Sequence, residues 1–152
     1  MSCAAPYKHF KSKEDLILAI HAYIHEKWTL LAEHICSVYE KEPRRCLVEL
    51  CLSNVRFWIG NPHFRSVHMM EGAAKKEPKQ EKGRFGMDVR IVELLRAEAA
   101  AQELSEEEER ELLYTVRSLL SGAILLLADG ELENDASAFR MFRRALEKAL
   151  EK

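Results

Sequence analysis

The chain has 152 residues, of which 47% are hydrophobic and 32% are charged, and its net charge is −2 at pH 7. This length suits one compact domain, and the composition excludes an intrinsically disordered protein. Because the net charge is close to zero, we expect no overall attraction to nucleic acid or to anionic lipid. Any contact with DNA therefore has to come from a local patch.

The cysteines and the apolar segments indicate in which cellular compartment the protein is found. The four cysteines show no Cys-x-x-Cys spacing, and the first ten residues contain no apolar signal segment. The longest apolar stretch, residues 119–128, is about half as long as a membrane span requires. We therefore expect a soluble, cytoplasmic protein with reduced thiols.

The first predicted element is a long helix that begins after Ser12. Ser12 followed by Asp15 resembles a capping box with aspartate in place of glutamate. Apolar residues then recur at the spacing of one buried helical stripe. They are Ile17, Ile24, Trp28, Leu31, Ile35 and Val38. The helix should end near Tyr39, because the residue before Pro43 is disfavoured in helical geometry.

A second helix is predicted from Pro43, which suits the first helical turn, to Gly60-Asn61-Pro62. Its apolar face consists of Leu47, Leu50, Cys51, Val55 and Trp58. A short helical piece should follow at residues 64–70. Residues 71–86 are rich in Gly, Pro, Lys and Glu, so we expect a mobile loop there.

Three predicted helices complete the chain. The first covers residues 87–102, and the second opens at a capping box formed by Ser105 and Glu108 and ends at Asp129-Gly130. The last covers residues 135–151. Since no segment has the pattern of a strand, the sequence predicts an all-α fold.

Residues 2–16 carry the most specific pattern in the chain. Tyr7-x-His9-Phe10 is followed by Ser12-Lys13-Glu14 and Leu16. This segment resembles the end of the helix-turn-helix and the start of the linking helix in TetR-family transcriptional regulators. Two later segments, 54–70 and 116–130, resemble one subgroup of TetR effector domains, although Ser121 stands where that subgroup usually has histidine.

The resemblance implies a TetR-like C-terminal ligand-binding helical bundle at residues 12–152, dimerising through its last two helices. It makes residues 1–11 the remnant of a recognition helix. The implied DNA-contacting residues are Ser2, Cys3, Tyr7, Lys8, His9 and Lys13. Because the family's DNA reader has three helices and this chain begins at the third, we expect no specific operator binding by these 152 residues. Either translation starts upstream of Met1, or the reader has been lost.

Aromatic and methionine side chains outline a candidate pocket for a hydrophobic or amphipathic effector. The predicted ligand-binding residues are Trp28, Arg56, Phe57, Trp58, Phe64, His68, Met69, Tyr114 and Arg117. For most single members of this set, ordinary core packing is the simpler alternative. Arg56 lies on a strongly apolar helix, so it should pair with a carboxylate such as Glu49 or meet an anionic ligand.

Residues 119–128 are apolar around most of the helix, and small residues there permit close helix approach. We expect this segment and the last helix to form half of a four-helix dimer interface. The predicted interface residues are Leu119, Ser121, Gly122, Ile124, Leu125, Phe139, Phe142 and Leu146. Complete burial within a single chain is the alternative.

Other chemistry is weakly supported. His21 and His25 lie one helical turn apart, but no second helix offers a matching metal-ligand set, so we expect no metal and no cofactor. Cys46 and Cys51 are better explained as small buried hydrophobic residues than as redox sensors. No nucleophile triad or phosphate loop is present, so we do not expect an enzyme. The main alternative to a regulator is a dimeric helical binding or interaction protein without a DNA role. The sequence identifies neither the effector nor the operator, and it leaves repression and activation open.

Overall fold

A computed structural model describes residues 9–69 and 88–151. Every regular element in these two ranges is a helix, which confirms the all-α prediction. In chain order they are α1 (Lys13–Val38), α2 (Pro43–Gly60), α3 (Pro62–Met69), α4 (Val89–Ala101), α5 (Glu106–Ala128) and α6 (Ala136–Ala149). The loop predicted at residues 71–86 lies outside the described residues.

The predicted helix starts are confirmed by their caps. At α1 the Ser12 hydroxyl accepts a hydrogen bond from the Asp15 backbone N–H at 3.1 Å. At α5 the Ser105 hydroxyl accepts from the backbone of Glu108, whose carboxylate accepts from the Ser105 N–H at 2.8 Å. These bonds satisfy amide groups that have no partner inside the helix. After α5, Gly130 adopts a left-handed φ of 74°, which a glycine tolerates without strain.

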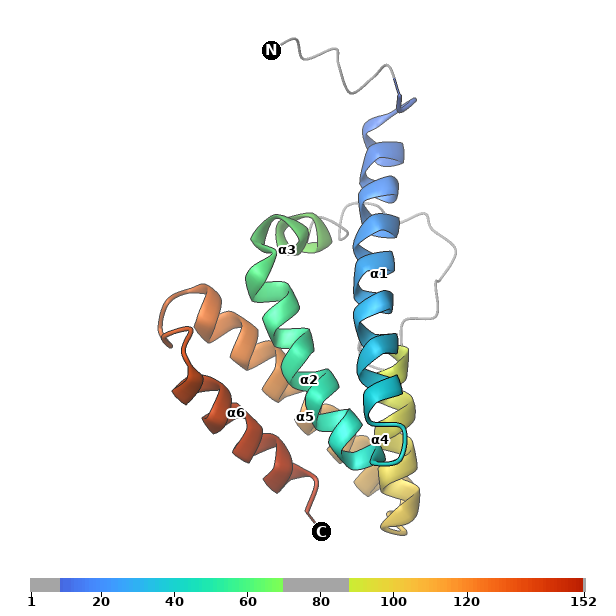
Figure 1. The fold of residues 1–152 in the computed structure, drawn as a ribbon, viewed down its shortest axis with the longest axis vertical. Coiled ribbons are helices and arrows are strands. Elements are labelled where there is room, and N and C mark those ends of the chain that lie inside the picture. Colours follow the sequence, from blue (N-terminus) through green and yellow to red (C-terminus); the bar gives the residue numbers. More distant parts are fainter. Residues whose placement is uncertain (1–8, 70–87, 152) are drawn as a thin grey trace.

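Helix α2 lies at the centre of the bundle (Figure 1) and packs against α1, α3, α4, α5 and α6. Its predicted core residues Leu47, Leu50, Cys51 and Val55 are fully buried, whereas Trp58 is half-buried. Each fully buried leucine contributes roughly 1.5–3 kcal/mol of transfer free energy. The apolar faces of the other helices meet around this helix and form one core.

Helix α1 is longer than the bundle that it packs against. Its buried residues Ile24, Trp28, Ala32 and Ile35 lie in its second half and centre, while its first turns extend beyond the other helices (Figure 1). The prediction that Val38 belongs to the buried stripe is wrong, since its side chain is 58% exposed. The chain turns toward α2 directly after this residue, and Ile35 and Tyr39 cover the core there instead.

Helix α6 closes the bundle by packing on α2 and α5. Phe142, Leu146 and Leu150 are buried at the spacing of one helical stripe, and Phe139 is half-buried beside them. The Arg143 guanidinium of α6 donates a hydrogen bond of 2.6 Å to the Glu49 carboxylate of α2. An ion pair therefore reinforces the apolar contact between these two helices.

Candidate effector site and dimerisation face

Four aromatic rings named by the sequence analysis do meet, together with one that it did not name. The Phe57 ring of α2 lies 5.5 Å from that of Trp28, 5.3 Å from that of Trp58 and 6.2 Å from that of Phe64, measured between centroids. Tyr23 contacts Phe64 edge to face at 6.0 Å. We call these five residues the aromatic cluster. They join α1, α2 and α3 at spacings at which aromatic pairs attract one another.

Trp28 is the fixed member of the aromatic cluster. Its ring is buried, and its indole N–H donates a 2.8 Å hydrogen bond to one carboxylate oxygen of Asp88. The other oxygen of Asp88 accepts from the Arg90 backbone N–H and caps α4. Asp88 thus ties the start of α4 to the middle of α1. The predicted helix began at residue 87, so the capping role of Asp88 was missed, and nothing in the pattern pointed to its contact with Trp28.

The other rings of the cluster are less enclosed. Phe57, Trp58 and Phe64 are half-buried, and the Tyr23 side chain of α1 is 49% exposed. The short helix α3, which packs on α1 and α2, supplies Phe64 and covers one side of the cluster. The rings fill the space between these three helices by contacting one another.

Arg56 does not pair with Glu49, the carboxylate named for it from the sequence. Its predicted partner was a carboxylate such as Glu49 or an anionic ligand. Glu49 is bound by Arg143, and the anionic ligand stays a prediction. The exposed Arg56 guanidinium instead lies over the Phe139 ring of α6, 4.5 Å from its centroid. This cation–π contact stabilises the positive charge of Arg56 at the surface between α2 and α6.

The remaining predicted pocket residues are not brought to the aromatic cluster by any described contact. Tyr114 is 64% exposed on α5, and Arg117 is half-buried on the same helix. The side chains of His68 and Met69 lie outside the described part of the structure. The expected pocket is therefore reduced, among the described residues, to the aromatic cluster.

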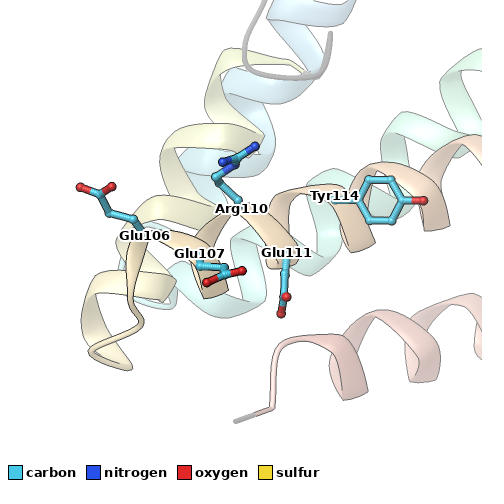
Figure 2. A pocket seen from close by; sticks show the side chains of 5 residues that line it. All are labelled: Glu106, Glu107, Arg110, Glu111 and Tyr114. Carbon is cyan, nitrogen blue, oxygen red and sulfur yellow. The ribbon is translucent and has the colours of Figure 1, made fainter.

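Tyr114 does line an open hollow on another side of the molecule (Figure 2). The other lining residues are Glu106, Glu107, Arg110 and Glu111. All five belong to α5, and Figure 2 shows their side chains spread along the outside of that helix rather than converging. Since a binding pocket needs walls that surround its ligand, this acidic surface is better described as the solvated first turns of α5.

Of the implied DNA-contacting residues, the structure describes two. His9 and Lys13 are both exposed, and they lie at the end of α1 that extends beyond the bundle. Ser2, Cys3, Tyr7 and Lys8 lie outside the described residues. The chain runs from His9 through the Ser12 cap directly into α1.

The end of α5 carries the exposed apolar surface that the sequence indicated. Leu125 is 57% exposed and Leu126 is 40% exposed, while Ser121 is exposed and Gly122 is half-buried. A Cβ atom added to Gly122 would meet no atom within 4 Å. We call these four residues the α5 face. The alternative of complete burial within a single chain is contradicted by these exposures.

Two other positions of the predicted dimer interface are wrong, because they are buried within the chain, and the remaining three stay predictions. Phe142 is buried and Leu146 is fully buried within the chain, so both belong to the core and are not available to a second subunit. Leu119, Ile124 and Phe139 are half-buried and pack against the core. The prediction treated α6 as an interface helix, but its apolar stripe is used by α2 and α5.

Helix α5 as a whole is long and apolar enough to cross a membrane by length and composition alone. The prediction that the chain has no membrane span rested on residues 119–128 alone. One such helix is weak evidence, because core helices of soluble proteins pass the same test. Only 28% of its most apolar window is buried, which agrees with the exposure of the α5 face.

Within the two described ranges, no three histidine, cysteine or acidic side chains gather in a way that could hold a metal ion. His25 Nδ1 lies 3.4 Å from the hydroxyl of Thr29, a neighbour on the same helix. Comparison of the chain with protein-family models, curated proteins and solved structures finds no match.

Proposed function

We propose that this chain is the dimeric, effector-responsive body of a TetR-type transcriptional regulator. The observation that carries the proposal is the position of the His9–Lys13 segment at the free end of α1. A DNA-reading unit attached there would be joined to the bundle by one continuous helix. The sequence resemblance assigns this same segment to the junction between the DNA reader and the linking helix.

The aromatic cluster is the proposed effector site. Its rings come from α1, α2 and α3, and three of them are half-buried. A flat hydrophobic or amphipathic molecule could replace the ring-to-ring contacts with contacts to itself if α3 moved outward. Such a site selects aromatic and amphipathic compounds, because aromatic walls offer apolar area with few fixed polar partners.

Helix α1 supplies the coupling. Trp28 lies in the aromatic cluster, and Lys13 lies on the same helix at its outer end. An effector that changes the tilt of α1 changes the distance between the two outer ends in a dimer. If DNA favours another spacing, effector and DNA weaken each other's binding by the same factor.

The α5 face is the proposed dimer contact. Gly122 leaves open space beside two exposed leucines, which is the arrangement that lets a second helix approach closely. A symmetric contact of this surface with its copy would bury Leu125 and Leu126. Dimerisation would also place two α1 helices at a defined spacing.

Spin labels test the coupling. In a chain with Cys3→Ser and Cys36→Ser, a label at Lys13→Cys on each protomer reports the spacing of the α1 ends by double electron–electron resonance. An anilinonaphthalene sulfonate serves as the amphipathic probe. We expect the probe to shift the distance distribution, because it separates the rings that position α1.

Matched variants localise the effect. Phe64→Ala removes a ring of the aromatic cluster and should weaken probe binding about tenfold, which is the loss of about 1.4 kcal/mol. Tyr114→Ala removes an exposed ring on α5 and should leave binding unchanged. Equal effects of the two variants on probe binding would show that the probe does not bind at the aromatic cluster.

The second candidate is a dimeric helical binding or interaction protein with no role at DNA. The observation that favours it is the ring packing, which closes the aromatic cluster without a ligand. In that case the probe would bind without changing the distance between the labelled α1 ends.

A further inference from the structure

Two cysteines from different helices are in contact at the corner between α1 and α2. Cys36 lies in the last turn of α1, and Cys46 lies in the first turns of α2. The Cys46 thiol donates to the Cys36 sulfur, and the two Sγ atoms are 3.5 Å apart. A disulfide has an S–S length of about 2.05 Å, so the sulfurs have to approach by about 1.5 Å. A disulfide therefore requires rotation about the side-chain bonds of the two cysteines.

The two thiols differ in access. Cys36 is partly exposed, whereas Cys46 is only 3% exposed. Burial, together with the hydrogen bond to Cys36, raises the pKa of Cys46 to about 12, so this group stays protonated at neutral pH. A reagent in solution therefore reaches Cys36 first, and Cys46 is placed to react with whatever forms on Cys36.

The remaining described cysteine is of another kind. Cys51 is fully buried in the core, and burial raises its pKa above the ordinary value. A thiol in such surroundings is unreactive. Cys46 and Cys51 were each predicted to be small buried hydrophobic residues, and the contact of Cys46 with Cys36 was not predicted.

We propose that Cys36 and Cys46 are a redox modification site that forms a reversible disulfide when the chain meets a low-molecular-weight disulfide. The Cys36 thiolate attacks one sulfur of the reagent, which releases one thiolate and leaves a mixed disulfide on Cys36. Cys46 gives up its proton to that leaving thiolate through solvent and attacks the Cys36 sulfur. The second reagent thiolate departs and takes up the Cys36 proton from solvent. Two protein thiols are oxidised, and one reagent disulfide is reduced to two thiols.

The disulfide would link α1 to α2 at the end of α1 opposite Lys13. It would hold the angle between these helices, which the corner residues otherwise maintain through contacts such as the Arg45 guanidinium 4.9 Å from the centroid of the Tyr39 ring. In a reducing compartment such a bond persists only during oxidative stress. The inference rests on the thiol geometry and is independent of the proposed effector and of DNA.

Peptide mapping tests the site in the full chain carrying Cys3→Ser. The protein is treated with oxidised glutathione, unfolded, alkylated and digested with trypsin, which cuts after Lys41 and Arg45 and so separates the two cysteines. We expect a disulfide-linked pair of peptides 28–41 and 46–56 whose fragment ions place the link between Cys36 and Cys46, with Cys51 alkylated. We also expect the melting temperature to rise by roughly 5–10 °C, because the crosslink restricts the unfolded chain. Dithiothreitol should reverse both changes.

Two variants complete the test. Cys36→Ser, at a partly exposed position, should abolish the linked pair and the rise in melting temperature. Cys51→Ala should keep both. Accumulation of glutathione on Cys36 without the linked pair, a link to Cys51, or no loss of thiols would each overturn the proposal.

Discussion

Helix α2 and residues 119–128 at the end of α5 look alike in sequence, since each is apolar on more than one side, yet the bundle treats them differently. In α2, Leu47, Leu50 and Val55 are fully buried. In α5, Leu125 and Leu126 remain largely exposed. Helix α2 is surrounded by α1, α4, α5 and α6, whereas the end of α5 is covered on its inner side only. Apolar content therefore predicts that a helix needs cover, but not whether its own chain provides that cover.

The largest expected effect comes from truncating the centre of α2. Leu50→Ala removes a fully buried side chain and leaves a cavity, so it should lower the free energy of unfolding by about 2–5 kcal/mol. Leu125→Ala makes the same chemical change on the α5 face. At protein concentrations that keep the chain monomeric, it should cost less than about 0.5 kcal/mol. Urea unfolding measures both, and equal losses would contradict the contrast between the two helices.

The next largest effect concerns self-association of the chain through the α5 face. Gly122→Leu fills the open space beside Leu125, so it should weaken a dimer formed through the α5 face at least about tenfold, or about 1.4 kcal/mol. The stability of the single chain should not fall, because leucine favours the helix over glycine by roughly 0.8–1 kcal/mol. Sedimentation velocity across a concentration series measures the dissociation constant.

A control separates steric blocking from a general change in the surface. Ala100→Leu adds a similar side chain at an exposed position of α4 and should leave self-association unchanged. A natural chain that stays monomeric at high micromolar concentration would remove the α5 face as a dimer contact. An unchanged dissociation constant in Gly122→Leu would mean that the dimer forms through another surface.

The smallest expected effect concerns the ion pair that joins α2 to α6. Glu49 and Arg143 form an ion pair with side chains 19% and 35% exposed, so Glu49→Gln should cost about 1 kcal/mol of unfolding free energy. A double-mutant cycle with Arg143→Gln isolates the coupling between the two side chains. The exposed pair Glu42 and Arg45 serves as the reference and should show no measurable coupling. Similar couplings for both pairs would mean that partial burial beside α2 adds nothing to the ion pair.

The local features of the fold could be predicted from the sequence because they depend on residues a few positions apart. Ser12 and Ser105 cap helices through backbone groups three residues away, and Pro43 starts α2 at a position where its missing N–H costs nothing. Helical periodicity likewise predicted most of the core. Leu50 and Leu146 are buried because they recur at the helical spacing.

The candidate site was predictable only in part. Trp28, Phe57, Trp58 and Phe64 were grouped by residue type, and the structure brings them together. Tyr114 was grouped with them for the same reason but lies on an open side of α5. Residue type indicates what a side chain can pack against, but the crossing of the helices determines which side chains meet.

The sequence by itself determined the all-helical architecture, the helix boundaries to within about two residues and the presence of an apolar surface at the end of α5, because these follow from periodicity and capping along one chain. Only the tertiary structure decided the partners across helices. It set Arg56 over Phe139, gave Glu49 to Arg143 and placed Cys36 against Cys46. Each of these contacts depends on how far a helix is rotated about its axis and where it crosses its neighbour, and no local pattern in the sequence specifies either quantity.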